Sequence, residues 1–171
     1  SDAQAATTVS DITGKIDLAV VAVPTALHFD TAMSLIKNGV HLLVEKPIAA
    51  SLTEAEAMVA AAAAAGTVLA VGQIERFNAA VRELGSAISE PIHIKATRVS
   101  PYSPRISDGV VHDLMIHDID IVLSLLGPDT EAIEVGGTGT QIHGPTDDLA
   151  NAHVLFDNGV TAAFETSRLG Q

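Results

Sequence analysis

The sequence predicts an α/β chain that begins with a parallel sheet and continues into an α+β domain with a mixed or antiparallel sheet. Short apolar runs alternate with helical patterns over residues 18–71, which is the order of consecutive β-α-β units. After about residue 79, strand patterns joined by a hairpin turn replace that alternation. We therefore expect two domains, residues 1–76 and residues 77–171.

The expected elements of the first domain follow one another with short connections. The run at residues 18–23 is nearly all apolar, as in strands that a parallel sheet buries on both faces, and Pro24 ends it. Apolar side chains then recur on one helical face up to a stop at Gly39. The remaining elements are a strand at 41–44, a helix at 51–65 that starts with a capping box (Ser51 with Glu54, or Thr53 with Glu56), and a strand at 68–71.

The second domain differs because its strand patterns alternate and its long helix is strongly apolar. That helix spans residues 111–126 and is closed by Gly127 and Pro128. Asp157, Asn158 and Gly159 form a good hairpin turn. The other expected elements are a helix at 78–88 and strands at 93–99, 133–138, 150–156 and 160–167. Both ends look cut, since the parallel sheet lacks neighbours at its start and the sequence stops directly after a hairpin strand.

Composition limits the possible classes of function. The chain has 171 residues and a formal net charge of -12, so it repels phosphate backbones and no nucleic-acid role is expected. No apolar run approaches the ~20 residues that a membrane-spanning helix needs. There is no cysteine, which excludes a disulfide framework and a thiolate metal site, and a cytoplasmic location is expected.

Glu45, Lys46 and Pro47 directly follow the second predicted strand. Ligands of open α/β sheets bind at the carboxyl ends of the strands, so Lys46 is well placed to meet a substrate. Pro47 restricts the backbone of Lys46 to extended conformations. A surface lysine paired with Glu45 explains the same pattern.

The long helix of the second domain carries short polar side chains on an otherwise apolar surface. Asp113, His117, Asp120 and Ser124 lie on one stripe if the helix has about 3.6 residues per turn. Histidine is the usual general acid or base, and a nearby carboxylate can orient it. The stripe indicates the wall of a cleft; the alternative is a helix with a modest polar face. His112 and His117 are five positions apart and do not share a face, so no metal site is expected.

Two further segments are expected at the same edge of the first sheet. Pro24, Thr25 and His28 follow the first strand and open a helix, whose free N–H groups suit a phosphate or the polar edge of a cofactor. Simple helix capping by Thr25 is the alternative. Arg76 and Asn78 follow the third strand and bring basic and amide groups to the same crevice.

Four of these segments, in this order along the chain, resemble the Gfo/Idh/MocA oxidoreductases. They are AVPTALH (22–28), VEKPIA (44–49), GQIERFNAAV (72–81) and DLMIHDID (113–120). The resemblance implies a Rossmann domain followed by a second domain of helices and strands. It also implies hydride transfer between a sugar or cyclitol carbon and NAD or NADP, and a homo-oligomer formed through the second-domain sheet.

The resemblance assigns a role to each segment. Lys46 and His117 would bind and deprotonate the hydroxyl group, and Asp113 would orient the substrate or His117. Contacts to the cofactor would come from Pro24, Thr25, His28, Glu45, Lys46 and Arg76. Contacts to the substrate would come from Asn78, Arg98, Tyr102, Arg105 and Asp113.

Residues 98–120 are most similar to a branch of the family that oxidises the 3-position of UDP-N-acetylglucosamine. An exposed loop without a ligand is the alternative for that segment. Other candidates are an inositol or glucose dehydrogenase, a glucose–fructose oxidoreductase, and a non-catalytic sensor module. The family's glycine-rich phosphate loop is absent from the sequence, as is the residue that selects NAD over NADP, so turnover by this stretch alone stays open.

Overall fold

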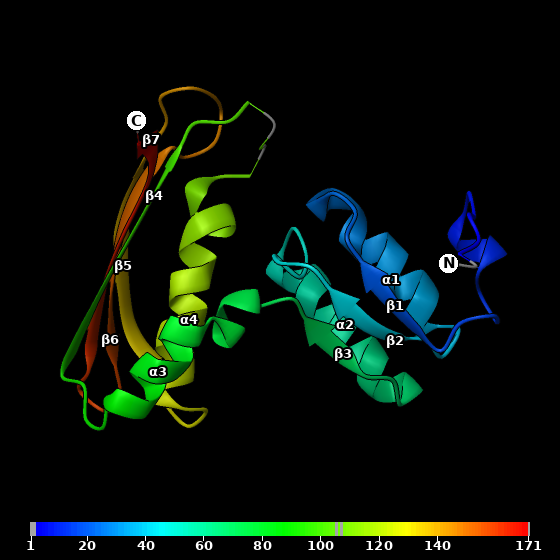
Figure 1. Cartoon of the computed structure of the whole chain (residues 1–171), viewed down its shortest axis with the longest axis horizontal. Helices are drawn as coiled ribbons and strands as arrows, with labels where there is room; N and C mark the ends of the chain where they lie inside the picture. The colour runs from blue at the N-terminus through cyan, green and yellow to red at the C-terminus, as the bar shows by residue number, and fades with distance from the viewer. Residues whose placement is uncertain (1–2, 105, 107, 171) are drawn as a thin grey trace. The chain divides into compact units, whose positions relative to one another are not determined.

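The computed structural model describes residues 3–104, 106 and 108–170. The chain divides into two compact units, residues 1–72 and residues 73–171 (Figure 1). The sequence had left residues 73–76 with the first domain. The 3-10 helix η3 (Ile74–Phe77) instead makes its ion pairs within the second unit, through Glu75 and Arg76.

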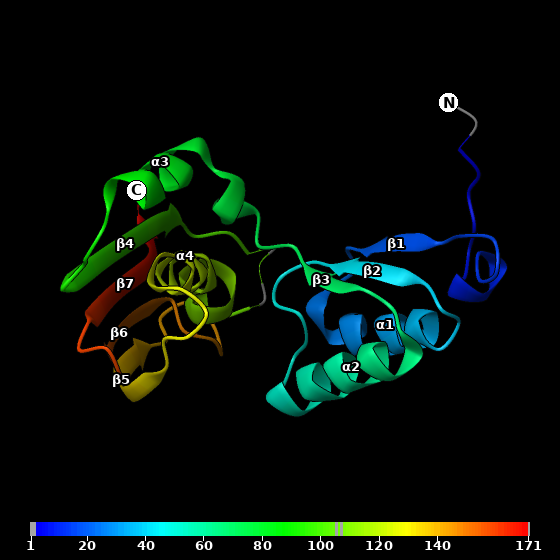
Figure 2. The same cartoon turned by 90° about the horizontal axis from the view of Figure 1, so that it is seen from below.

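The first unit is a parallel three-stranded sheet with two helices. Strands β1 (Leu18–Val21), β2 (His41–Val44) and β3 (Leu69–Val71) lie side by side in that order. Helices α1 (His28–Ile36) and α2 (Leu52–Ala65) both cover the same face of the sheet (Figure 2). Short 3-10 helices η1 (Val9–Asp11) and η2 (Thr25–Leu27) complete the unit.

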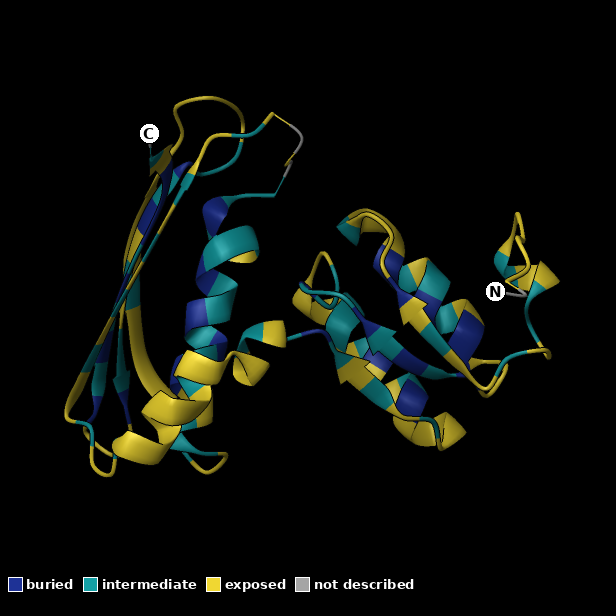
Figure 3. Ribbon diagram, viewed as in Figure 1, coloured by how far each residue is buried: buried dark blue, intermediate teal, exposed yellow. Residues whose placement is uncertain are grey.

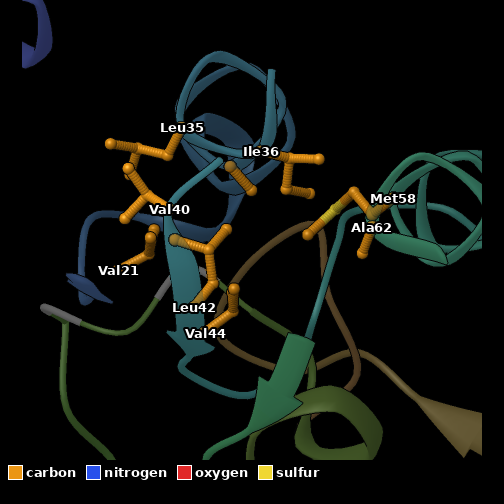
Figure 4. Close-up of a cluster of buried hydrophobic side chains, with 9 residues drawn as sticks. Val21, Leu35, Ile36, Val40, Leu42, Val44, Met58 and Ala62 are labelled. Carbon is orange, nitrogen blue, oxygen red and sulfur yellow. The ribbon is translucent and has the colours of Figure 1, made fainter. Parts of the chain in front are cut away.

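One face of this sheet holds the core and the other is open. Val21, Leu35, Ile36, Leu42 and Met58 belong to the buried cluster between the sheet and the helices (Figure 4). The exposed fractions of Leu18 and Val20 are 62% and 57%, so β1 is not buried on both faces as its sequence suggests (Figure 3). The reason is that both helices of this unit lie on a single face.

The boundaries of α2 are set by its caps. The Ser51 hydroxyl accepts a hydrogen bond from the Glu54 amide at 3.3 Å, and the Glu54 carboxylate accepts one from the Ala50 amide at 3.1 Å. Of the two predicted pairs, Ser51 and Glu54 cap the helix, although Glu54 binds the Ala50 amide and not the Ser51 amide that a capping box uses. Gly66 closes the helix with φ 68°, a conformation that glycine adopts without steric cost.

The second unit is a mixed four-stranded sheet with a long helix along one face (Figures 1 and 2). Its strand order is β4 (His93–Pro101), β7 (Thr161–Gly170), β6 (Leu149–Phe156), β5 (Ala132–Thr140). The β4–β7 pair is parallel and the other two pairs are antiparallel, so of the predicted alternatives, mixed or antiparallel, the sheet is mixed. Helix α3 (Ala79–Ala87) precedes β4. The core contains Met115, Val122, Phe156 and Phe164.

The long helix is not a single α-helix. A π-helical turn, η4 (Val111–Met115), leads into α4 (Ile116–Leu126). The predicted stripe at 3.6-residue spacing therefore does not carry across the turn, since a π-turn takes up more residues. Asp118 and Asp120 are buried, whereas Ser124 is exposed. Such π-turns occur frequently at functional sites, and this one contains Asp113.

No helix among the described residues is both long enough and apolar enough to cross a bilayer.

Candidate active site

In the first unit, Lys46 lies at the carboxyl end of β2, between Glu45 and Pro47. Glu45 and Lys46 are half-buried and Pro47 is buried. The Lys46–Pro47 peptide bond is cis. The Glu45 amide donates to the Val21 carbonyl at 3.0 Å, which continues the sheet past the end of β2. The lysine is thus held on a segment fixed to the sheet at its start.

His28, the first residue of α1, fixes the same segment from the other side. Its ring is 1% exposed, and Nδ1 lies 2.9 Å from the Pro47 carbonyl while Nε2 lies 2.8 Å from the Val23 carbonyl. The ring therefore bridges the segments that follow β1 and β2. A neutral imidazole has one N–H donor, so only one carbonyl receives a hydrogen bond in that form and both do in the imidazolium form.

Gly72, at the end of β3, leaves room for Glu45. A Cβ atom on Gly72 would lie 2.9 Å from Oε2 of Glu45 and 3.4 Å from its Cα. The Gly72 amide donates to the Val44 carbonyl at 2.8 Å. The carboxyl ends of β2 and β3 thus pack closely, with the Glu45 side chain over the glycine.

Pro24 and Thr25 follow β1, as predicted, but they do not open α1 directly. Thr25 begins the 3-10 turn η2, and α1 starts three residues later at His28 with Leu27 in the N-cap position. The Leu27 amide donates to the Pro24 carbonyl at 2.8 Å. The predicted contact of a helix N-terminus with a cofactor would therefore come from a short 3-10 turn.

In the second unit, the π-turn positions Asp113 beside an arginine that the sequence had not singled out. Nη2 of Arg168 donates to Oδ2 of Asp113 at 3.1 Å. The Arg168 side chain is 1% exposed and that of Asp113 is 20% exposed. The Asp113 amide donates to the Gly109 carbonyl at 3.0 Å, and His117 lies half-buried four positions further along.

Arg98 is held by a neighbouring carboxylate of the same motif. Its Nε and Nη2 atoms donate to Asp118 at 2.7–3.1 Å, and Nη1 lies 3.7 Å from Glu75. The hydrogen bonds that Arg98 donates to Asp118 outweigh the cost of burial and raise the pKa of the Arg98 guanidinium. The predicted substrate contact thus has two of its five N–H donors committed to Asp118.

Arg76 forms the equivalent pair with Asp120, two positions further along the motif. Its Nε and Nη2 atoms donate to Asp120 at 2.7 Å each, and these bonds raise the pKa of the Arg76 guanidinium. Asn78 donates to Glu75 at 3.0 Å and accepts from the Ala80 amide at 3.0 Å, which caps α3. Together these contacts tie η3 and the start of α3 to α4 and β4.

Tyr102 stacks on His143 with ring centroids 4.3 Å apart and planes inclined at 39°. Its side chain is exposed, and the contact joins the loop after β4 to the loop between β5 and β6. Arg105, the remaining predicted substrate contact, lies outside the described residues. The roles assigned to these residues stay predictions.

A cavity of about 490 Å³ lies between the long helix and the β5–β6 part of the second sheet. Val122, Leu123, Val154 and Phe156 are among its mainly apolar lining residues, and neither Asp113 nor His117 lines it. A sugar needs hydrogen-bonding partners, so we place the candidate site on the polar motif instead. No group of three or more metal-ligating side chains occurs within the described part of the chain.

Comparison with known proteins defines the family. The model described as "Oxidoreductase family, NAD-binding Rossmann fold" matches residues 1–73, and the GFO/IDH/MocA C-terminal domain model matches residues 60–171. The chain belongs to the Gfo/Idh/MocA family. The predicted family and fold class are thus confirmed.

Individual relatives agree with this assignment. The chain is 34% identical to UDP-N-acetylglucosamine 3-dehydrogenase of Acidithiobacillus ferrooxidans, over 94% of this chain and 51% of that protein. It is 31% identical to scyllo-inositol 2-dehydrogenase (NAD(+)) of Bacillus subtilis, over 90% of this chain and 49% of that protein. A solved structure of the Acidithiobacillus enzyme matches with TM-score 0.90 at 33% identity, covering 98% of this chain and 56% of that one. The chain spans about half the length of the curated relatives it matches.

Proposed function

We propose that the complete gene product oxidises a CH–OH carbon of a nucleotide sugar, with NAD or NADP as hydride acceptor. The observation that carries the proposal is the pair of restrained motifs: Lys46 on a segment bridged by His28, and Asp113 with His117 on a segment tied to Arg168. The 34% identity to UDP-N-acetylglucosamine 3-dehydrogenase supports UDP-N-acetylglucosamine as the first substrate to test.

In this proposal the oxidation needs a base for the hydroxyl proton and a cation for the alkoxide that develops. His117 takes the proton, and the Lys46 ammonium stabilises the negative charge on the oxygen. Asp113 orients His117 or a hydroxyl group of the sugar. The bound nicotinamide supplies the acceptor for the hydride that leaves the same carbon, so that proton and hydride together balance the two-electron oxidation.

The residues after β1 and β2 fit the polar edge of a dinucleotide. Pro24, Thr25, Glu45 and Lys46 follow parallel strands at their carboxyl ends, where ligands of such sheets bind. In this proposal His28 contributes to the cofactor site by fixing the backbone around Pro47, since its ring contacts two backbone carbonyls. A gentamicin A biosynthesis protein that is 25% identical was solved in complex with NAD, which supports this class of cofactor.

We assign the substrate contacts to Asn78, Arg98, Tyr102, Arg105 and Asp113, and a further cofactor contact to Arg76. The Arg76 and Arg98 side chains remain 49% and 28% exposed within their ion pairs, so each keeps surface for a polar ligand. A homo-oligomer formed through the second-unit sheet and a cytoplasmic location complete the proposal. The oligomer rests on the resemblance, and the location rests on the absence of cysteine.

A cyclitol is the second candidate substrate. It is favoured by the 31% identity to scyllo-inositol 2-dehydrogenase, which covers 90% of this chain. The two candidates differ chemically because only the nucleotide sugar carries a diphosphate. A requirement for Arg98 in substrate binding would therefore favour the nucleotide sugar.

The test offers NAD and NADP to the complete gene product together with UDP-N-acetylglucosamine, myo-inositol or scyllo-inositol, and follows the absorbance of reduced nicotinamide. Lys46→Ala and His117→Ala are expected to lower kcat by roughly 10²–10⁴-fold, the usual contribution of such groups. The matched controls are Lys37→Ala and His112→Ala, which remove exposed side chains of the same kind. Absence of turnover with every pair, despite measurable cofactor binding, would instead indicate the sensor module.

A further inference from the structure

Arg168 is the largest of the fully buried side chains described in this chain. It lies near the end of β7, two positions after the buried Thr166, on the side of the strand that is packed against the helix. Transfer of a guanidinium from water to a protein interior is costly unless its charge is paired and its donors are used. The position of this arginine therefore calls for a specific partner.

That partner is the first aspartate of the Asp113–His117 motif. The ion pair joins a fully buried guanidinium to a carboxylate that keeps one-fifth of its surface exposed, at 3.1 Å. The arginine thus holds the carboxylate from the interior, and the exposed part stays available to a ligand. Among the residues that the structure describes, Nε of Arg168 has no hydrogen-bond partner, so the guanidinium is not saturated by the protein.

An irregularity in the sheet lies beside Arg168. Val99 pairs with Ser167 and Pro101 pairs with Gly170, so β7 has one residue more than β4 over this stretch. Bulges of this kind re-aim side chains and are frequent next to active sites. The Arg168 amide still donates to the Asp148 carbonyl at 2.8 Å, which keeps the residue registered with the start of β6.

A second carboxylate lies near the same guanidinium. Oδ2 of Asp148, a buried residue, accepts from the amides of His143 and Ile142 at 2.7 and 2.8 Å. These two bonds, and to a smaller extent the electrostatic interactions with His143 and Arg168, lower the pKa of the Asp148 carboxyl. Since Asp148 already has its own amide donors, removal of Arg168 leaves Asp113 as the carboxylate that loses a charged hydrogen-bond donor.

We propose that Arg168 is a positioning residue for the reaction, which holds the Asp113 carboxylate in the orientation that lets it act on the substrate or on His117. The inference rests on the proposed function, because Asp113 matters to turnover only there. Removing one partner of a buried ion pair destabilises a protein because the other partner is left unpaired. A purely structural Arg168 would therefore lose stability on substitution by methionine but leave kcat of the folded protein unchanged, whereas a positioning Arg168 would lower kcat.

The test is a double-mutant cycle on the complete gene product with Arg168→Met, Asp113→Asn and the double variant. Arg168→Met is expected to lower kcat by up to about 100-fold, as a misplaced catalytic group can do, with the KM for the nicotinamide cofactor unchanged. The double variant is expected to be no slower than Asp113→Asn alone, because the arginine acts through the aspartate. Arg168→Lys, which keeps the charge, should recover part of the rate, and Arg82→Met is the control for loss of an arginine elsewhere.

Two results would overturn the inference. One is a folded Arg168→Met variant with the wild-type kcat; the other is a double variant whose loss is the product of the two single losses. If Arg168→Met does not fold, Arg168→Lys against Asp113→Asn completes the same cycle. If the wild type turns over no substrate, the proposed function fails first. The Tm values of the two single variants and the double variant are then compared instead of their rates. Additive shifts in Tm would show that Arg168 does not hold Asp113.

Discussion

The two units hold their motif residues by different physical means. In the first unit the His28 ring contacts two backbone carbonyls. The position of Lys46 is set by the backbone of the adjoining segment. In the second unit, arginines reach across from other elements to Asp113, Asp118 and Asp120. The first arrangement fixes backbone and the second fixes side chains.

This difference predicts how each unit responds to its surroundings. Hydrogen bonds to carbonyls depend weakly on ionic strength, whereas partly exposed ion pairs are screened by salt. A ring between two carbonyls restrains the two segments that follow β1 and β2, so damage there should spread along the backbone. An arginine–aspartate pair restrains one side chain at a time, so each pair can be tested separately.

The largest effect on stability is expected from Asp118→Ala, which leaves Arg98 partly buried without its main partner. Breaking a fully buried pair costs about 3–5 kcal/mol, and we expect about 2 kcal/mol because Arg98 is 28% exposed and water takes over part of the interaction. Hydrogen exchange resolved by unit is the measurement, with Asp129→Ala, an exposed aspartate, as the control. Equal losses of stability in both units would contradict the conclusion that this ion pair restrains only the second unit.

His28→Ala should destabilise the first unit by about 1–2 kcal/mol, because at least one buried carbonyl loses its donor. His28→Asn keeps an N–H donor and should lose less. Urea unfolding at low and high salt provides the sharper comparison. The loss from His28→Ala should be unchanged by salt, whereas the loss from Asp118→Ala should shrink; a strong salt dependence for His28 would contradict a contact with neutral carbonyls.

Alanine substitutions at two glycines compare a Cβ that would meet backbone with a Cβ that would meet a flexible side chain. A Cβ at Gly137 would lie 2.7 Å from the Asn151 carbonyl oxygen, a backbone atom, so Gly137→Ala should cost about 1–2 kcal/mol. Gly72→Ala should cost less, since its nearest contact is the end of the Glu45 side chain. We expect Gly72→Ala to raise the KM for the cofactor by moving Glu45. An unchanged KM would remove Glu45 from the cofactor contacts.

The smallest effect concerns acid stability. Because folding lowers the pKa of Asp148, this group contributes stability above the ordinary pKa of an aspartate, about 3.9, and loses it as pH falls through the lowered value. Asp148→Asn should therefore be less stable than the wild type near neutral pH, and the two should converge in acid. Thermal unfolding between pH 2 and 7 checks this; a gap that widens in acid would show the opposite sign.

Much of the architecture followed from local patterns. The apolar runs and helical faces of residues 18–71 predicted the parallel sheet, and Asp157-Asn158-Gly159 predicted the β6–β7 hairpin, where Gly159 has φ 83°. The motif order predicted the family. These features depend on residues close together in the sequence, which is why a single sequence contains them.

The tertiary structure decided what those patterns leave open. Periodicity did not reveal the π-turn at Val111–Met115, because the residues of that turn satisfy an ordinary helical pattern equally well. Arg76 and Arg98 were predicted to contact the cofactor and the substrate, and in the structure they are engaged by aspartates 44 and 20 positions away. Arg168 meets Asp113 across 55 positions. The sequence by itself determined the strands, the helices and the motifs; which charges neutralise one another depends on how distant segments pack, and only the folded chain determines that.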